Sequence, residues 1–198
     1  MTTNGDIQAK TSFPERLEGR RIVVLGAGRS GRAAAALLAR ENARVALVDD
    51  KPDAVLPEEL DDVMASHVEL FLGEGERPSL EKAEGLVVSP GIPLTHPLVV
   101  EAGERGLPVI GELELGSRFI QAPFVAVTGT NGKTTTACWI AHLLKVGGCH
   151  TVLCGNVGTA MSGVVGNPAD WFVLEGSSFQ LETIERFHPR VAVILNLS

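Results

Sequence analysis

Apolar residues in this chain form short runs that alternate with longer stretches rich in alanine and leucine. The runs RIVVLG (21–26) and RVALVDD (44–50) have the length and β-branched content of strands, and SGRAAAALLARE (30–41) between them is typical of a helix. The same alternation predicts further strands at 68–72, 85–88 and 108–110 and a helix near 97–105. Strands that are apolar on both faces and alternate with helices predict a parallel sheet covered on both sides.

A second series of elements follows Gln121-Ala122-Pro123. The run FVAVTG (124–129) predicts a strand, and KTTTACWIAHLLK (133–145) predicts a helix. Three more apolar runs predict strands, namely HTVLCG (150–155), WFVLEG (171–176) and VAVILN (191–196). The sequence therefore predicts an α/β fold of two units: a Rossmann-like parallel-sheet domain over residues 1–111, followed by part of a phosphate-loop (P-loop) α/β domain over residues 112–198.

The last predicted strand runs to the final residue, Ser198. In parallel sheets the residues that bind ligands lie in the loops that follow the strands. The chain stops where such a loop is expected to begin. We therefore expect it to be the N-terminal portion of a longer protein.

Composition and charge exclude several classes of function. The 198 residues are 44% hydrophobic, and 24 acidic against 17 basic residues give a net charge of −7, which argues against nucleic acid as a partner. We find no apolar run as long as a membrane span and no signal-peptide core at the start, so no membrane partner is expected. The three cysteines lack CxxC spacing, as expected of a reduced, cytoplasmic protein.

The first glycine-rich turn, GAGRSG (26–31), follows a predicted strand and opens a predicted helix. It fits the pattern GxGxxG, and Asp49 ends the next strand about twenty residues later, where a dinucleotide fold places its ribose acceptor. This spacing favours an NAD(P)-dependent oxidoreductase. A helix N-terminus binds any anion, however, so another nucleotide or a close-packing turn without ligand also fits. The turn Ser89-Pro90-Gly91, after another predicted strand, offers further N–H groups at the same edge.

The second glycine-rich turn, GTNGKTT (129–135), also lies between a predicted strand and a predicted helix. Its backbone amides could form an anion nest, with Lys133 bridging β- and γ-phosphates and Thr134 binding Mg²⁺. The usual pattern has a glycine where this chain has Val127, so the loop would begin later, at Gly129. Glu175, at the end of another predicted strand, is a candidate for the acidic metal ligand. The alternatives are that Glu175 is only exposed to solvent, and that the turn 129–135 only caps the following helix.

Four segments together resemble the Mur ligases of bacterial peptidoglycan synthesis, from about Arg20 to the last residue. These segments are SPGIP (89–93), GTNGKTT (129–135), GNVG (155–158) and EGSSFQLE (175–182). The resemblance is best to the branch that adds D-glutamate. It implies an ATP-dependent amide ligase that joins D-glutamate to UDP-N-acetylmuramoyl-L-alanine through an acyl phosphate, and a full-length enzyme that is a monomer. A nucleotide-binding module without catalysis is the other class that we consider.

The resemblance also implies roles for individual residues. Its substrate-binding residues would be Arg29 and Ser30 near the diphosphate, Asp49 and Asp50 near the uracil, Ser89 and Gly91 lining that site, Asn156 on the diphosphate, and Ser177 and Gln180 on the muramoyl group. The ATP phosphates would be bound by Gly129, Thr130, Asn131, Gly132, Lys133, Thr134 and Thr135. Lys133 and Glu175 would be catalytic, and Thr134 and Glu175 would hold Mg²⁺.

Two departures from the family pattern affect this interpretation. Gly176 replaces the usual leucine, and we expect it to loosen the strand exit and to shift Glu175. The segment Asn196-Leu197-Ser198 resembles the start of the family's Asn-x-Ser/Thr-x-Asp-His segment but ends before the aspartate and the histidine. We therefore do not expect the chain as given to complete catalysis alone.

Overall fold

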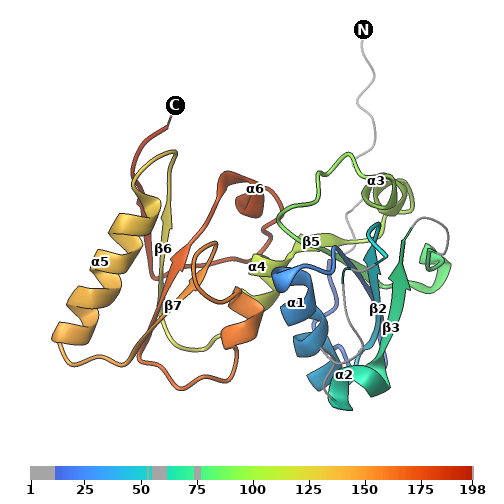
Figure 1. Ribbon diagram of the computed structural model, residues 1–198, viewed down its shortest axis with the longest axis horizontal. Coiled ribbons are helices and arrows are strands. Elements are labelled where there is room, and N and C mark those ends of the chain that lie inside the picture. Colours follow the sequence, from blue (N-terminus) through green and yellow to red (C-terminus); the bar gives the residue numbers. More distant parts are fainter. Residues whose placement is uncertain (1–11, 53, 55–61, 74–76, 198) are drawn as a thin grey trace, which may run out of the picture.

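The structure, a computed structural model, describes residues 12–52, 54, 62–73 and 77–197. It contains two parallel sheets that lie side by side, each with helices packed on its faces (Figure 1). The α/β class predicted from the alternation of apolar runs is therefore confirmed. Among the described residues, no helix is both long and apolar enough to cross a membrane.

The first sheet has the strand order β3-β2-β1-β4-β5. Its strands are β1 (Arg21–Leu25), β2 (Arg44–Asp49), β3 (Val68–Leu72), β4 (Gly85–Val88) and β5 (Val109–Gly111). The order reverses between β1 and β4, which is where open α/β sheets form a ligand crevice at the carboxyl ends of their strands.

Both faces of this sheet are buried, which explains why its strands are continuously apolar. Ile22 and Val24 of β1 pack on one face with α1 (Arg29–Arg40) and α2 (Asp62–His67), whereas Val23 and Leu25 pack on the other with α3 (Pro97–Glu104) and the 3-10 turn η2 (Leu80–Lys82). Alternate residues of one strand thus serve two separate cores.

The second sheet has the strand order β7-β8-β6-β9. Its strands are β6 (Phe124–Thr128), β7 (Thr151–Gly155), β8 (Trp171–Glu175) and β9 (Val191–Ile194). One face packs on α5 (Lys133–Val146), and the other packs on α4 (Glu112–Ser117) and the 3-10 turn η3 (Met161–Val164). A further short helix, α6 (Ser178–Leu181), follows β8.

The chain passes from β5 directly into α4, and a buried glutamate of α4 fixes the junction. The Glu114 carboxylate is fully buried and accepts hydrogen bonds from the backbone N–H groups of residues 185–187 at 2.9–3.1 Å. Arg118 completes the contact with an ion pair of 2.7 Å to Glu114. Because the segment 185–187 leads into β9, these bonds join α4 to the second sheet. The division of the chain at residue 111 stays a prediction.

Every strand predicted from an apolar run is present; the strands at 68–72 and 85–88 have the predicted ends, and the others differ by one or two residues. The strand expected at 108–110 is β5 at 109–111, for example. The short helices α2, α4 and α6 were not predicted. Each has six residues or fewer, which is too short for a helical period to show in the sequence.

Candidate functional site

The loop between β6 and α5 exposes the start of a long helix. Gly129 and Gly132 both have positive φ, 142° and 82°, which a glycine adopts without strain. Gly132 is the N-cap of α5, and neither a capping side chain nor an acidic residue occupies the first turn. Lys133 instead places a positive charge at the positive end of the helix dipole, where it destabilises the helix. An anion bound at this turn would account for the arrangement.

Two side chains hold this loop in its present shape. Lys133 Nζ donates to the carbonyl oxygens of Gly129 at 2.7 Å and Thr130 at 3.1 Å. Asn196, just after β9, accepts from the N–H groups of Thr130 and Asn131 at 2.9 and 3.0 Å with Oδ1, and its Nδ2 donates to the Asn131 carbonyl at 3.1 Å. The sequence predicted the loop but not the hydrogen bonds from Asn196, because this residue reaches the loop only when β9 pairs with β6.

Glu175 ends β8 and brings three predicted site residues together. Its side chain is 2% exposed, and Oε2 accepts from the Thr134 hydroxyl at 2.8 Å, while Oε1 accepts from Asn156 Nδ2 at 3.2 Å. The Asn156 N–H also donates to the Glu175 carbonyl at 2.8 Å. The helix start, the end of β8 and the turn after β7 therefore meet at one carboxylate.

A hydroxyl and a carboxylate within hydrogen-bond distance are the hard oxygen ligands that Mg²⁺ prefers. In the described part of the chain no group of three or more His, Cys, Asp or Glu side chains could hold a metal. The donor set fits a cation held by Thr134 and Glu175 together with nucleotide oxygens and water, since Mg²⁺ keeps several waters and uses one or two carboxylates.

The backbone at Gly176 is held by the second sheet. The Gly176 N–H donates to the Val127 carbonyl at 2.9 Å, so the bonding between β8 and β6 continues past Glu175. A β-carbon at position 176 would lie 3.6 and 3.7 Å from the side chains of Leu174 and Leu181, which is ordinary contact. The backbone at this point is thus fixed by the sheet rather than by the missing side chain.

Ser177 and Gln180 form a capping box at the start of α6. Gln180 Oε1 accepts from the Ser177 N–H at 3.0 Å, and Ser177 Oγ accepts from the Gln180 N–H at 3.3 Å. Gln180 is 4% exposed, and its amide nitrogen makes no hydrogen bond to a described residue. A contact between Gln180 and a ligand would therefore use that nitrogen. The muramoyl contact stays a prediction.

The first glycine loop is closed by its own neighbours. Gly26 has a φ of 93°, and its carbonyl accepts from Ser89 Oγ at 2.9 Å. The two carboxylate oxygens of Asp49 accept from the N–H groups of Ala27 at 2.7 Å and Lys51 at 3.0 Å. Asp49 therefore shapes the loop, and a nucleoside contact there would use its remaining lone pairs.

The other predicted residues of the first unit lie around the start of α1 and the carboxyl edge of the sheet. Arg29 is exposed beside the half-buried Ser30, and Gly28 caps α1 without a side-chain bond. Gly91 is exposed in the turn after β4. Asp50 forms an ion pair with Arg77 at 3.2 Å and a hydrogen bond of 3.4 Å with His96 Nε2. The start of α1 thus fits an anion, whereas Asp50 is held by neighbouring side chains.

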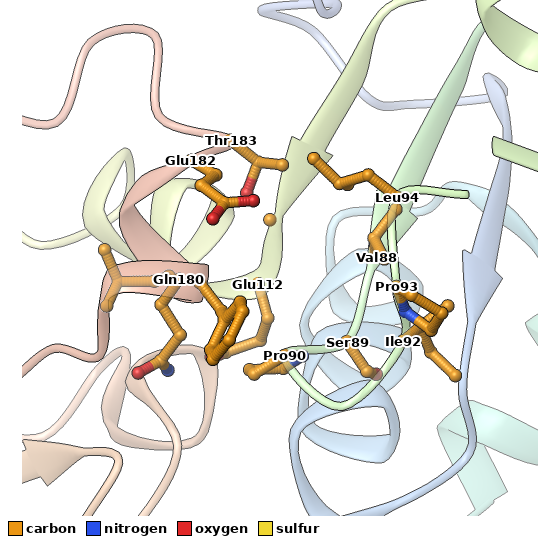
Figure 2. Close-up of a pocket in the computed structure, with 13 residues that line it drawn as sticks. Val88, Ser89, Pro90, Ile92, Pro93, Leu94, Glu112, Gln180, Glu182 and Thr183 are labelled. Carbon is orange, nitrogen blue, oxygen red and sulfur yellow. The ribbon is translucent and has the colours of Figure 1, made fainter. Parts of the chain in front are cut away.

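A pocket lies between the two units, with the carboxyl ends of β4 and β5 on one side and α6 on the other. Figure 2 shows Ser89, Pro90, Ile92 and Pro93 of the turn after β4 facing Gln180, with Glu112 between them. The wall consists of Val88, Ser89, Pro90, Ile92, Pro93, Leu94, Gly111, Glu112, Leu113, Phe179, Gln180, Glu182 and Thr183. It therefore brings two of the predicted substrate residues, Ser89 and Gln180, to one cavity.

Comparisons with known proteins cover nearly the whole of this architecture. Residues 20–111 match the family model "Mur ligase MurD-like, N-terminal domain", and residues 127–198 match "Mur ligase middle domain". Similar curated proteins are named UDP-N-acetylmuramoylalanine--D-glutamate ligase. The one from Koribacter versatilis is 40% identical over 184 residues, which are 92% of this chain and 41% of that protein; the one from Pelotomaculum thermopropionicum is 46% identical over 185 residues, 90% of this chain and 40% of that protein.

The chain thus spans about 40% of the length of the curated relatives that it matches. Among solved structures, the UDP-N-acetylmuramate:L-alanyl-gamma-D-glutamyl-meso-diaminopimelate ligase from Neisseria meningitides aligns with a TM-score of 0.54 at 22% identity, over 91% of this chain and 61% of that one. A murein peptide ligase from Psychrobacter arcticus aligns with a TM-score of 0.53 at 20% identity, over 91% and 43%. At these identities the solved structures support the fold alone.

Proposed function

The chain belongs to the Mur ligase family, and we propose on this basis that it forms the nucleotide-binding part of an ATP-dependent ligase that joins D-glutamate to UDP-N-acetylmuramoyl-L-alanine. The observation that carries the proposal is the contact of Thr134 and Asn156 with the buried Glu175 carboxylate. This contact joins the helix start of a phosphate loop to an acidic strand end, as phosphoryl transfer requires. The oxidoreductase alternative is not supported, because the GxGxxG unit lies within the matched Mur ligase domain.

The loop 129–135 would bind the triphosphate of ATP. The uncapped first turn of α5 offers N–H groups and the positive end of the helix dipole to phosphate oxygens. Lys133 Nζ now contacts two loop carbonyls, and a turn of its flexible side chain would carry the charge to the β- and γ-phosphates. Mg²⁺, held by Thr134 and Glu175, would neutralise phosphate charge when bound.

The first unit would bind the uridine diphosphate of the sugar–peptide. Arg29, Ser30 and the start of α1 provide an anion site at the carboxyl edge of the sheet. Ser89 and Gln180, which lie on opposite sides of the pocket between the units, would contact the sugar–peptide. In the proposed reaction the alanyl carboxylate attacks the γ-phosphorus, ADP leaves, and the amine of D-glutamate then displaces phosphate from the acyl phosphate.

Calorimetric titration of the 198-residue chain tests this proposal. We expect ATP with Mg²⁺ and UDP-N-acetylmuramoyl-L-alanine each to bind, and NADH not to bind. Lys133→Ala should weaken ATP binding about a hundredfold, because it removes charge-assisted hydrogen bonds to phosphate, and should leave sugar–peptide binding unchanged.

Lys145→Ala is the matched control for this variant. Lys145 lies in the last turn of the same helix, so its removal changes the charge of α5 equally without touching the loop, and we expect ATP affinity to stay the same. Unchanged ATP binding in Lys133→Ala would contradict the phosphate-loop assignment. Tight binding of NADH without binding of UDP would overturn the ligase proposal altogether.

A further inference from the structure

A second cleft lies at the edge of the first sheet that is opposite the glycine-rich loop 26–31. It has a volume of about 440 Å³, and residues at the amino ends of β1, β2 and β3 line it. The loop 26–31 follows the carboxyl end of β1, so the cleft and this loop lie at opposite edges of a parallel sheet. The cleft is therefore separate from the site described above.

Two arginines at this edge are direct neighbours. Arg21 is the first residue of β1 and Arg44 is the first residue of β2, and the two are partners in the register of these strands. Neighbouring strands are about 4.8 Å apart. Alternation places both side chains on the face of the sheet that also carries Val23 and Ala46. Like charges on directly opposite residues of paired strands are destabilising, so the arrangement requires negative charge nearby.

The chain supplies little of that negative charge. Lys82 in η2 adds a third positive side chain to the wall of the cleft. Glu84, one of two carboxylates that line it, is bound by the Arg20 side chain and by the Arg21 N–H at 3.2 Å. The other, Glu69, is exposed. Among the described residues, no carboxylate forms an ion pair with any of the three cationic side chains in the wall. The cleft thus carries unpaired positive charge in a chain whose net charge is −7.

We propose that this cleft binds a phosphorylated small molecule, whose phosphate group accepts hydrogen bonds from Arg21, Arg44 and Lys82. The planar guanidinium group of arginine matches the oxygens of phosphate, and the charge of a phosphate offsets the repulsion between the two neighbouring arginines. A volume of about 440 Å³ is typical of sites for small molecules. The inference does not rest on the proposed function, because none of these three residues belongs to the proposed ATP or sugar–peptide sites.

Nuclear magnetic resonance of the isotopically labelled 198-residue chain tests the inference, with inorganic pyrophosphate as the probe. At constant ionic strength we expect the amide signals of residues 44–46 and 66–69 to shift and to saturate, independently of any shift in the loop 129–135. Arg44→Gln and Lys82→Gln should each weaken the binding reported by these signals about tenfold, because each removes a charge-assisted hydrogen bond. Both side chains are exposed, so neither substitution should disturb the fold.

Arg190→Gln is the matched control. Arg190 is an exposed arginine directly before β9, so its substitution removes the same charge at the start of a strand in the second sheet. The affinity of the cleft for pyrophosphate should stay the same. Shifts that do not saturate, that sodium chloride reproduces at equal ionic strength, or that persist unchanged in Arg44→Gln and Lys82→Gln would overturn the inference. Shifts confined to the loop 129–135 would overturn it as well.

Thermal unfolding without added anion separates ligand binding from a structural role of Arg44. Removal of one of two neighbouring like charges should raise the melting temperature of Arg44→Gln about 1–2 °C above that of the wild type. Pyrophosphate should then stabilise the variant less than it stabilises the wild type. An arginine that only supports the fold would instead give a lower melting temperature without anion, and this result would contradict the inference.

Discussion

The two glycine-rich loops lie in equivalent places, each between a strand and a helix, but they are built in different ways. The first loop, 26–31, is closely packed around Gly26 and Gly31. A β-carbon on Gly31 would collide with the Gly26 carbonyl and lie 2.7 Å from Ser89 Oγ, and Asp49 binds the Ala27 N–H from the next strand. Gly26 and Gly31 allow the close approach of helix to strand, and the side chains of Asp49 and Ser89, from outside the loop, hold it in place.

The second loop, 129–135, is packed less tightly, although a β-carbon on Gly129 would lie 3.1–3.2 Å from Leu195 and Asn196. A β-carbon on Gly132 would meet only a leucine side chain at 3.5 Å. Thr134 contacts Glu175 of β8, whereas Lys133 crosses the loop to two of its own carbonyl oxygens. Of these two polar groups, Thr134 is thus the one that contacts a segment outside the loop.

This difference shows what a glycine pattern does and does not reveal. GxGxxG predicts that backbone segments approach closely, which the first loop confirms, but the pattern does not specify the ligand. The second loop departs from its pattern at Val127, which is a fully buried strand residue. Its chemistry is specified by Lys133, Thr134 and the acidic strand end at Glu175.

Gly31→Ala should have the largest effect and would test the closed state of the first loop. The new β-carbon meets backbone that cannot move without separating α1 from β1, so we expect a loss of about 3 kcal/mol in the free energy of unfolding. Urea unfolding followed by circular dichroism measures it. Gly28→Ala is the control, because Gly28 has a φ of −67° and no atom lies within 4 Å of the position that its β-carbon would take. Equal stability of the two variants would mean that the loop is not closed by packing.

Asn196→Ala should have a smaller effect and tests the order of the second loop. Asn196 bonds the N–H groups of Thr130 and Asn131 from an exposed position, so its loss should hardly change stability. We expect ATP with Mg²⁺ to bind about fivefold more weakly, because binding would then have to order the loop. Calorimetric titration with ATP and Mg²⁺ measures this affinity. Asn167→Ala is the control, because Asn167 is an exposed asparagine outside the loop. Tighter ATP binding would instead mean that Asn196 competes with phosphate for these amides.

The parts of the site that the sequence predicted are those that depend on one strand and the turn after it. Thr134, Asn156 and Glu175 each lie at or just after the carboxyl end of a strand, and parallel pairing brings such ends to one edge. The hydrogen bond from the Gly176 N–H to Val127, which holds the strand exit, could not be predicted from the sequence, and the effect of Gly176 on Glu175 stays a prediction.

The parts that were not predicted depend on pairings between distant segments. Asn196 is 65 and 66 residues from its loop partners, and Glu114 is 71 to 73 residues from the N–H groups that it binds. Glu112 and Glu114 belong to ELELGS, which reads as an acidic surface stretch, yet both are buried. Burial of a charged residue becomes visible only when its tertiary partners are known.

The smallest predicted effect concerns Glu112, which lies between the two units and is influenced by Arg29 at the first loop. Burial raises its pKa in the folded chain, so the proton that it binds stabilises the fold at low pH, and this stabilisation is lost as the pH rises through the folded-state pKa. Glu112→Gln keeps the acceptor for the Ser162 N–H, which Glu112 Oε1 binds at 2.6 Å, and has no proton to lose. Its stability relative to the wild type should therefore increase from about pH 5 to about pH 9, as thermal unfolding at each pH would measure. A difference that stays constant with pH would mean that the carboxylate remains ionised beside Arg29, and that the first loop supplies the charge which holds it.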